Sequence, residues 1–347
     1  MGWLSKPLLR RSKIGLIIGI ASALLLVGGV AGLRWWYQHN LSPVSISQRT
    51  SYFTIEPGDN LHQIATGLKR AGLIRSPSAF EYYVRTNELY KDLQAGTYSL
   101  SQSMSVKEIV GKIVRGDIAK NLLTILPGKR LDQIKEAFAT AGYSAAEINS
   151  AFNPQSYGGL PTLSSLPAGA NLEGYLYPDS FQKDAKTPAT AIVKQSLELL
   201  SQNLTSDIIA GFSAQGLSVY QGIILASIVY RETDNPKFES GVAQVFLSRL
   251  RANMRLESDA SAHYGADIAG VARDLNFDSA YNSYLHEGLS PGPISNFTAD
   301  ALKAVAYPAS TDYLYFVAGD DGTVHFSRTL EEHQAAVAKY CTKQCGQ

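Results

Sequence analysis

The hydrophobic pattern separates one long apolar run near the N-terminus from a series of shorter amphipathic segments. Residues 14–33 contain no charged side chain, and about twenty such residues are what a helix needs to cross a bilayer core. Basic residues precede the run and aromatic residues follow it, namely Lys6, Arg10, Arg11, Lys13, Trp35, Trp36 and Tyr37. This arrangement predicts a cytoplasmic tail at 1–13 and an uncleaved transmembrane anchor at 14–37.

A cleaved signal peptide is the alternative interpretation of the apolar run. A signal peptide has a shorter apolar core and ends at small residues, whereas this run is followed by Arg34 and two tryptophans. The pattern therefore favours the anchor, and it predicts that the chain beyond about residue 40 lies outside the plasma membrane.

A strand–turn–helix pattern occurs twice in the next part of the chain. The sequence FTIEPGDNLHQIATGLKRAG at 53–72 aligns with LTILPGKRLDQIKEAFATAG at 123–142. Each copy predicts a strand, a Pro-Gly turn and an amphipathic helix that ends near a glycine. With the polar, aperiodic residues 38–51 as a linker, the first copy opens a small module at 52–120, and the second copy opens a larger domain at 121–347.

The most apolar segment of the larger domain ends in a carboxylate. The sequence IILASIVYRE at 223–232 predicts a buried helix, in which Glu232 shares a face with Leu225 and Ile228. Pro236 ends this helix, because its ring disfavours the α conformation at the preceding residue. Burial and the helix dipole both disfavour an ionised carboxylate in the last turn, so the sequence predicts a raised pKa for Glu232.

A carboxyl group that stays protonated in an apolar setting is suited to general acid catalysis. Glycosidases use such a group to protonate the glycosidic oxygen. The alternative is a structural ion pair between Glu232 and either its neighbour Arg231 or Arg249 on the following helix. Local physical chemistry leaves both interpretations open.

Net charge and motif content exclude several classes of function. The formal net charge is +1, so the chain lacks the basic field of a nucleic-acid-binding protein. It has no common zinc or phosphate-binding motif, and its histidines show no ligand spacing, so we expect no metal and no cofactor. Cys341 and Cys345 are compatible with a disulfide in an exported tail or with two free thiols.

Five sequence blocks carry the strongest family signature. They are LEGYLYPDSF at 172–181, LASIVYRET at 225–233, VFLSRLRANMRLESD at 245–259, AYNSYLHEGLSPGPISNF at 280–297 and LYFVAGDDGTVHFSRT at 314–329. In this order, and within a match over residues 53–340, they resemble the YceG-like family, the endolytic murein transglycosylases. The sequence PGDNLHQIA at 57–65 also resembles LysM-like carbohydrate-binding modules, with a packing module that binds nothing as the alternative.

The resemblance implies cleavage of peptidoglycan glycan strands between N-acetylmuramic acid and N-acetylglucosamine. In that family the muramyl 6-hydroxyl, rather than water, attacks the anomeric carbon and leaves a 1,6-anhydro end. A single carboxyl group can therefore act first as acid and then as base. The expected fold is α+β, with one transmembrane helix, a LysM-like module and a larger catalytic domain that contains a mixed sheet. The expected setting is the bacterial plasma membrane, with the N-terminus cytoplasmic, nascent glycan strands as substrate, enzymes of cell-wall synthesis as further partners and no nucleic acid.

Residues in the matching blocks are candidates for the site. Tyrosines can stack on sugar rings and Asn282 can hydrogen-bond to them, and the alternative is that the tyrosines fill interfaces. Glu173 and Asp179 either support the cleft or cap a neighbouring helix. The candidates for substrate binding are Glu173, Tyr175, Tyr177, Asp179, Ser258, Asp259, Tyr264, Tyr281, Asn282 and Tyr284, and Glu232 is the catalytic candidate.

Two positions depart from the family pattern. The family usually has glutamate where this chain has Tyr230, and Gln-Ser-Asp-Pro-Thr where it has Glu-Ser-Asp-Ala-Ser at 257–261. We assign the acid to Glu232 because it shares the helix face of the buried residues. The substitution at Tyr230 favours an alternative from another class, a non-catalytic peptidoglycan-binding or scaffold protein. A muramidase that hydrolyses the bond is the alternative among enzymes.

Overall fold

Hydrophobic side chains gather into two separate cores, one in each of two units of the chain. The computed structural model describes residues 28–46 and 50–343. The two units are Met1–Lys120 and Asn121–Gln347. Each unit is described by itself below.

Most of the predicted anchor lies outside the described residues. The predicted cytoplasmic tail and the greater part of the apolar run fall within residues 1–27, which are not described. Residues 28–41 are helical, and Trp35 in this segment is 69% exposed. Among the described helices, none has both the length and the apolar composition of a membrane span by itself. Only α8 (Ser206–Ala214) and α9 (Val219–Glu232) meet both criteria as a pair, across a bend of 87°. The anchor stays a prediction.

From residue 50 onward, the first unit has the element order strand, helix, helix, 3-10 helix, strand, helix. Its elements are β1 (Thr50–Ile55), α2 (Leu61–Arg70), α3 (Pro77–Thr86), the 3-10 helix η1 (Leu89–Lys91), β2 (Gly96–Ser101) and α4 (Val106–Val114). Strands β1 and β2 pair in antiparallel fashion, with Ile55 opposite Gly96. Asn60 and Gln63 form a capping box that starts α2 directly after the Pro-Gly turn. The strand, turn and helix predicted for the first repeat copy are confirmed.

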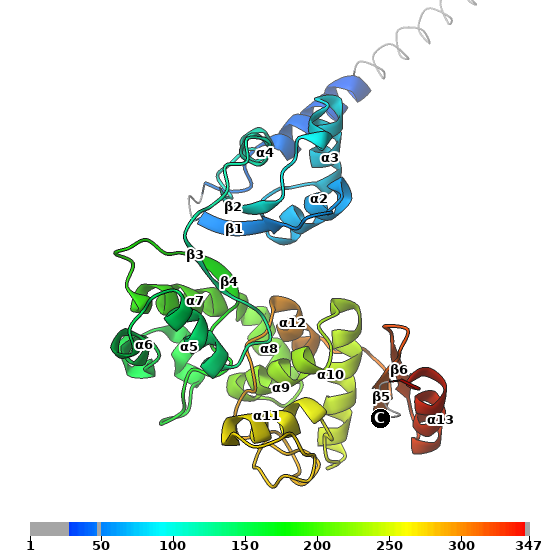
Figure 1. Ribbon diagram of the computed structural model, residues 1–347. Coiled ribbons are helices and arrows are strands. Elements are labelled where there is room, and N and C mark those ends of the chain that lie inside the picture. The colour runs from blue at the N-terminus through cyan, green and yellow to red at the C-terminus, as the bar shows by residue number, and fades with distance from the viewer. Residues whose placement is uncertain (1–27, 47–49, 344–347) are drawn as a thin grey trace, which may run out of the picture. The chain divides into compact units, whose positions relative to one another are not determined.

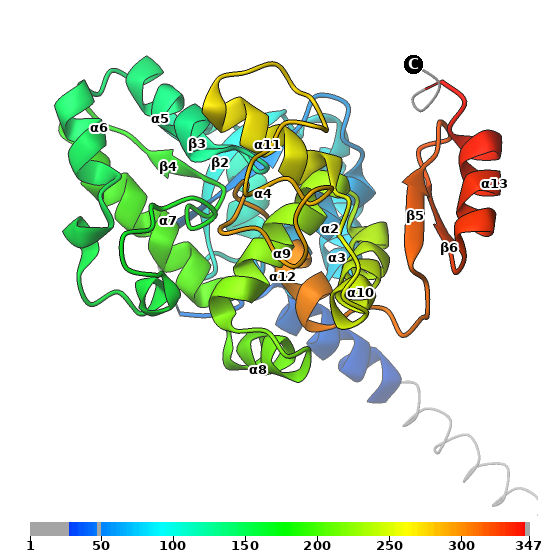
Figure 2. The same cartoon turned by 90° about the horizontal axis from the view of Figure 1, so that it is seen from below.

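The second unit contains the second repeat copy, a group of packed helices and a C-terminal lobe. Its first elements are β3 (Leu122–Ile125), α5 (Leu131–Thr140), α6 (Ala145–Ala151), the 3-10 helices η2 (Pro154–Tyr157) and η3 (Pro161–Ser165), β4 (Asp179–Gln182) and α7 (Ala189–Asn203). After α8 and α9 follow α10 (Pro236–Arg251), α11 (Asp259–Ala269), α12 (Ala299–Ala306), β5 (Tyr315–Ala318), β6 (Val324–Ser327) and α13 (Leu330–Tyr340). Figures 1 and 2 show β5, β6 and α13 as a lobe beside α10.

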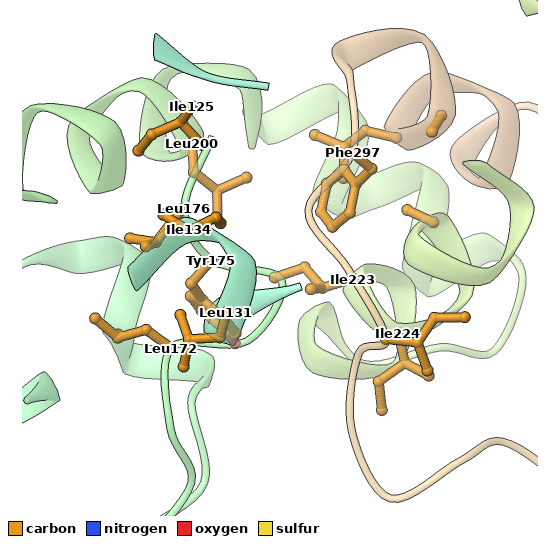
Figure 3. Close-up of a cluster of buried hydrophobic side chains, with 14 of the residues drawn as sticks. Ile125, Leu131, Ile134, Leu172, Tyr175, Leu176, Leu200, Ile223, Ile224 and Phe297 are labelled. Atoms are coloured by element: carbon orange, nitrogen blue, oxygen red, sulfur yellow. The ribbon is translucent and has the colours of Figure 1, made fainter. Parts of the chain in front are cut away.

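Helix α9 is central to the core of the second unit. Residues 222–229 are all buried along it, and it packs on α8, α10, α11 and α12. Gly222 permits the close approach of α8, because a Cβ atom at this position would lie 2.4 Å from the ring of Phe212. Figure 3 shows side chains of this core, among them Leu131, Ile134, Tyr175, Ile223, Ile224 and Phe297. The buried helix predicted from the apolar run is confirmed. Packing against four other helices fixes the position of its C-terminal end.

The prediction of a mixed sheet in the larger domain is wrong. The described strands of this unit form two separate antiparallel pairs, β3 with β4 and β5 with β6. Each of these strands is only four residues long. Most apolar residues of this unit's core lie on helices. Helices, rather than further strands, therefore supply most of its buried surface. The α+β class itself is confirmed, with small sheets and many helices.

The C-terminal segment is tied to the turn of the β5–β6 hairpin. Cys341, just after α13, is buried and disulfide-bonded, and the only other cysteine of the sequence, Cys345, lies outside the described residues. The carboxylate of Asp320 in the hairpin turn accepts hydrogen bonds from the backbone N–H groups of Thr342 and Lys343, each at 2.9 Å. Of the two states left open for the cysteines, Cys341 therefore has the disulfide-bonded one.

Candidate active site

Glu232 is the last residue of α9 and lines an open cavity of about 620 Å³. The walls of this cavity come from four parts of the second unit: the Pro-Gly-Lys turn at 127–129, the end of α9 with the loop to residue 235, Phe238 in the first turn of α10, and the β5–β6 hairpin at 318–324. The carboxyl group therefore lies between an apolar helix and a space that is open to a ligand.

Ser258 holds the carboxyl group of Glu232 in place. Its Oγ donates a hydrogen bond of 2.5 Å to Glu232 Oε1 and accepts one of 3.2 Å from the N–H of Ser261. The N–H of Ser258 in turn donates to Ser283 Oγ at 2.8 Å. Ser258 is also the N-cap of α11, so the carboxyl group lies at the N-terminus of this helix, where the dipole favours a negative charge.

The surroundings of Glu232 act on its pKa in both directions. Burial raises the pKa to about 7, and the nearby carboxylate of Asp259 raises it as well. The hydroxyl of Ser258, the N–H of Ala260 and the charge of Arg231 oppose this by stabilising the anion. A carboxyl group with a pKa near neutrality can both give and take a proton at physiological pH.

Neither arginine considered as an ion-pair partner pairs with Glu232. Arg231 donates from Nη1 to the carbonyl oxygen of Gly128 at 3.0 Å. Arg249 forms an ion pair of 2.8 Å with Glu257 and donates to backbone carbonyls of neighbouring segments. Within the described part of the chain, the ion-pair interpretation of Glu232 therefore has no support.

The structure brings three further candidates together with Glu232. Ser258 contacts it directly, and Asp259 influences its pKa. The hydroxyl of Tyr284 donates to Asp259 Oδ1 at 2.6 Å. The pKa of Tyr284 is raised mainly by burial, and the charges of Asp259 and Glu232 add to this. Ser258 thus bonds to the acid directly, whereas Asp259, which accepts from Tyr284, acts on the acid through its charge.

Glu173, Tyr264 and Tyr281 form a second cluster, at the N-terminus of α5. Both carboxylate oxygens of Glu173 accept from the N–H of Leu131, at 3.0 and 3.1 Å, and one accepts from the hydroxyl of Tyr264 at 3.1 Å. The ring of Tyr281 lies 4.7 Å from that of Tyr264, centroid to centroid. Glu173 therefore caps the N-terminus of α5, and burial raises its pKa to about 7.

The remaining candidates have structural contacts. Tyr175 and Asn282 have no exposed surface, so the expectation that they touch a sugar is corrected for this conformation. Asn282 donates to two carbonyl oxygens of its own loop, and the hydroxyl of Tyr175 lies 2.9 Å from Ser165 Oγ. Tyr177 is half-buried with its hydroxyl bonded to the backbone at residue 299, and Asp179 begins β4. None of these four residues lines the cavity at Glu232.

The sequence interpretation missed the turn at 127–129 as a wall of the site. Gly128 has φ +70°, and a Cβ atom there would lie 3.0 Å from the ring of Tyr230. Asn296 clamps the turn, since its Oδ1 accepts from the N–H of Lys129 at 2.8 Å and its own N–H donates to the carbonyl oxygen of Lys129 at 2.9 Å. The Pro-Gly pair of the repeat was the available signal, but nothing in the sequence connects residue 128 with residue 296.

Glu239 is a second buried carboxyl group near the site. It is 1% exposed, and neither oxygen has a hydrogen-bond partner among the described residues. Burial raises its pKa to about 7, and the charges of Asp300 and Asp234 add to this. It does not line the cavity at Glu232. No group of three or more His, Cys, Asp or Glu side chains in the described part of the chain is arranged to hold a metal ion.

The fold and the site define an α+β protein in which a half-buried carboxylic acid at the end of a core helix lines an open cavity. Residues 53–339 match the family model of the YceG-like family, and the chain belongs to this family. The crystal structure of a YceG-like protein, lmo1499 from Listeria monocytogenes, is 30% identical and has a TM-score of 0.55, covering 83% of this chain and 99% of that chain.

Two proteins named endolytic murein transglycosylase are similar to the chain over most of its length. The protein from Streptococcus pneumoniae serotype 2 (strain D39) is 31% identical over 352 residues, which cover 92% of this chain and 63% of that protein. The protein from Bacillus subtilis (strain 168) is 30% identical over 324 residues, which cover 88% of this chain and 89% of that protein. The match therefore spans less than two thirds of the streptococcal relative.

Proposed function

We propose that the protein is a membrane-anchored endolytic transglycosylase that cleaves peptidoglycan glycan strands between N-acetylmuramic acid and N-acetylglucosamine. The observation that carries the proposal is the position of Glu232, a single carboxyl group with a pKa of about 7 that lines an open cavity. Family membership and the names of the similar proteins support the same substrate class.

In the proposed reaction, protonated Glu232 donates its proton to the glycosidic oxygen as the bond from the muramyl C1 to this oxygen breaks. The muramyl 6-hydroxyl then attacks C1 and transfers its proton to the carboxylate. The strand ends in a 1,6-anhydro ring, the acid is regenerated, and no water is consumed. Between the two steps, the Ser258 hydroxyl and the N-terminus of α11 stabilise the Glu232 anion.

The product distinguishes this proposal from its alternatives. We expect digests of purified glycan strands with the full chain to contain fragments with anhydro ends, one water lighter than reducing ends, as measured by mass spectrometry. Fragments with reducing ends would instead indicate a muramidase. Binding to the strands without any fragment would indicate the non-catalytic scaffold protein.

The membrane setting is part of the proposal and rests on the sequence. The basic residues before the apolar run favour a cytoplasmic N-terminus and an extracytoplasmic catalytic domain. An anchor restricts cutting to strands near the membrane, because linker reach sets the effective concentration. Nascent strands and the enzymes that make them are the partners that this placement favours, and the first unit is a candidate for additional glycan binding.

Topology can be measured directly. A reporter that is active only outside the plasma membrane, fused after Gln347, is expected to be active. In a variant with glutamine at Lys6, Arg10, Arg11 and Lys13, the protein is expected to lose its preferred orientation, so the activity of the same reporter should fall. Activity only from a reporter that works in the cytoplasm would contradict the proposed orientation.

A further inference from the structure

The second repeat copy forms a cavity of its own next to the one at Glu232. This second cavity, of about 380 Å³, is lined by β3, the turn and one face of α5, with Leu126, Lys129, Gln133, Glu136, Ala137 and Thr140 among its residues. Lys129 also lines the cavity at Glu232. The two cavities therefore adjoin at this lysine, within the second unit.

The junction between the cavities has a rigid backbone. Asn296 bonds to the N–H and the carbonyl oxygen of Lys129, and its side-chain amide donates to the carbonyl oxygen of Leu126 at 3.0 Å. Arg231 bonds to the carbonyl oxygen of Gly128 from the α9 side. Among the described residues the ammonium group of Lys129 is in no ion pair. A fixed backbone thus presents an unpaired cation between two hollows.

The second cavity has the surface chemistry that a sugar ring requires. Leu126 is 52% exposed and offers an apolar patch. Gln133, Glu136 and Thr140 follow one another at helical spacing on α5, so they share a face and offer hydrogen-bonding groups. Pyranose rings have an apolar face and hydroxyl edges, and this combination is complementary to both.

The charge of Lys129 selects among glycans. A strand of N-acetylated sugars is neutral apart from the carboxylates of its muramyl substituents, which are the lactyl carboxylate of a peptide-free strand or the carboxylates of a stem peptide. An ammonium group binds a carboxylate through charge-assisted hydrogen bonds. An unpaired lysine at the junction therefore complements muramyl-containing strands rather than neutral ones.

We propose that the second repeat copy is a glycan subsite, which binds a sugar of the strand beyond the cleaved bond while Lys129 pairs with a muramyl carboxylate. The inference rests on the proposed function, since it places the strand across the cavity at Glu232. An enzyme that cuts within a strand must hold sugars on both sides of the bond, and the cavity on α5 supplies a place on one side. The repeat thereby has a role in binding as well as in packing.

Binding by the full chain tests the subsite without relying on turnover. In a Glu232→Gln background, in which strand cleavage is expected to be slow, dissociation constants are measured for peptide-free strands, peptide-bearing strands and neutral chitin oligomers. Thr140→Arg and Ala137→Arg fill the cavity from α5, and Thr140 is exposed, so this replacement leaves the core intact. Lys129→Gln removes the cation, and Lys186→Gln at an exposed position outside both cavities is the matched control.

The arginine variants are expected to weaken binding of the neutral chitin oligomers, because the added side chain fills the cavity and its charge has no partner on chitin. Lys129→Gln is expected to weaken binding of muramyl strands about fivefold, with chitin binding and the Lys186→Gln control unchanged. A loss confined to peptide-free strands assigns the lactyl carboxylate, and a loss confined to peptide-bearing strands assigns the stem peptide.

Unchanged binding in both arginine variants overturns the subsite. An equal loss for chitin and muramyl strands in Lys129→Gln overturns the carboxylate pairing. Failure of the proposed function shows separately, as the absence of anhydro-ended fragments from the protein with Glu232 intact.

Discussion

Glu232→Gln is expected to reduce the rate of strand cleavage by about 10²–10⁴-fold, because it removes the proton that general acid catalysis transfers. The amide has nearly the same size and still accepts the hydrogen bond from Ser258, so the site should keep its shape. The rate is measured as the release of anhydro-ended fragments, and the fold is checked by thermal unfolding. A folded Glu232→Gln protein that cuts at the original rate would assign the acid to another residue.

Glu239→Gln is the matched control for this substitution. Both residues are glutamates whose pKa is raised to about 7 by burial, but only Glu232 lines the cavity. We expect Glu239→Gln to retain most of the cleavage activity. If both variants lost activity equally, the loss would reflect the removal of a buried carboxyl group in general rather than the removal of the acid.

Glu239→Gln is expected to change the pH dependence of stability by about 1–3 kcal/mol. The pKa of Glu239 is about 7 in the folded protein against an ordinary value of 4.5. Between these two values the unfolded chain loses this proton while the folded chain keeps it. The stability that Glu239 allows is therefore fully present below about pH 4.5 and is lost as the pH rises through about 7.

Urea unfolding at pH 5 and pH 8 measures this effect. The free energy of unfolding of Glu239→Gln, relative to that of the original protein, should be higher at pH 8 than at pH 5. Comparing the two pH values cancels any cost of the buried amide that does not depend on pH. Glu287→Gln, which removes an exposed carboxylate, controls for the change in net charge. An identical effect of Glu239→Gln at both pH values would mean that this carboxyl group ionises in the folded protein as freely as in the unfolded chain.

The charge of Glu239 acts on Tyr230 and bears on why this chain has a tyrosine at position 230. The family usually has glutamate here, which left a non-catalytic protein as an alternative. In the structure, the ring of Tyr230 packs on the turn at Gly128, and its pKa is raised by burial and by the charges of Asp234 and Glu239. A glutamate at position 230 would add another negative charge next to Asp234 and Glu239. Tyr230 thus suits its own surroundings. Having tyrosine at position 230 does not remove the candidate acid, which is Glu232.

Local signals in the sequence determined the elements that carry the site. The apolar periodicity predicted α9 as a buried helix with Glu232 at its end, and the Pro-Gly repeat predicted both strand–turn–helix copies. Such features depend on residues within one or two turns of each other, so a single stretch of sequence is enough to predict them. The same pattern predicted a raised pKa for Glu232, and burial is its largest cause in the structure.

Tertiary structure alone decided what surrounds the acid. Ser258 reaches Glu232 from the start of α11, and Asn296 clamps the turn at Lys129 across 167 positions of sequence. It also decided that Tyr175 and Asn282 are core residues and that the strands form separate pairs instead of a mixed sheet. Contacts of this kind depend on how distant helices pack, and residue type and spacing do not specify packing, because a tyrosine or an asparagine suits a buried position and a binding surface equally well.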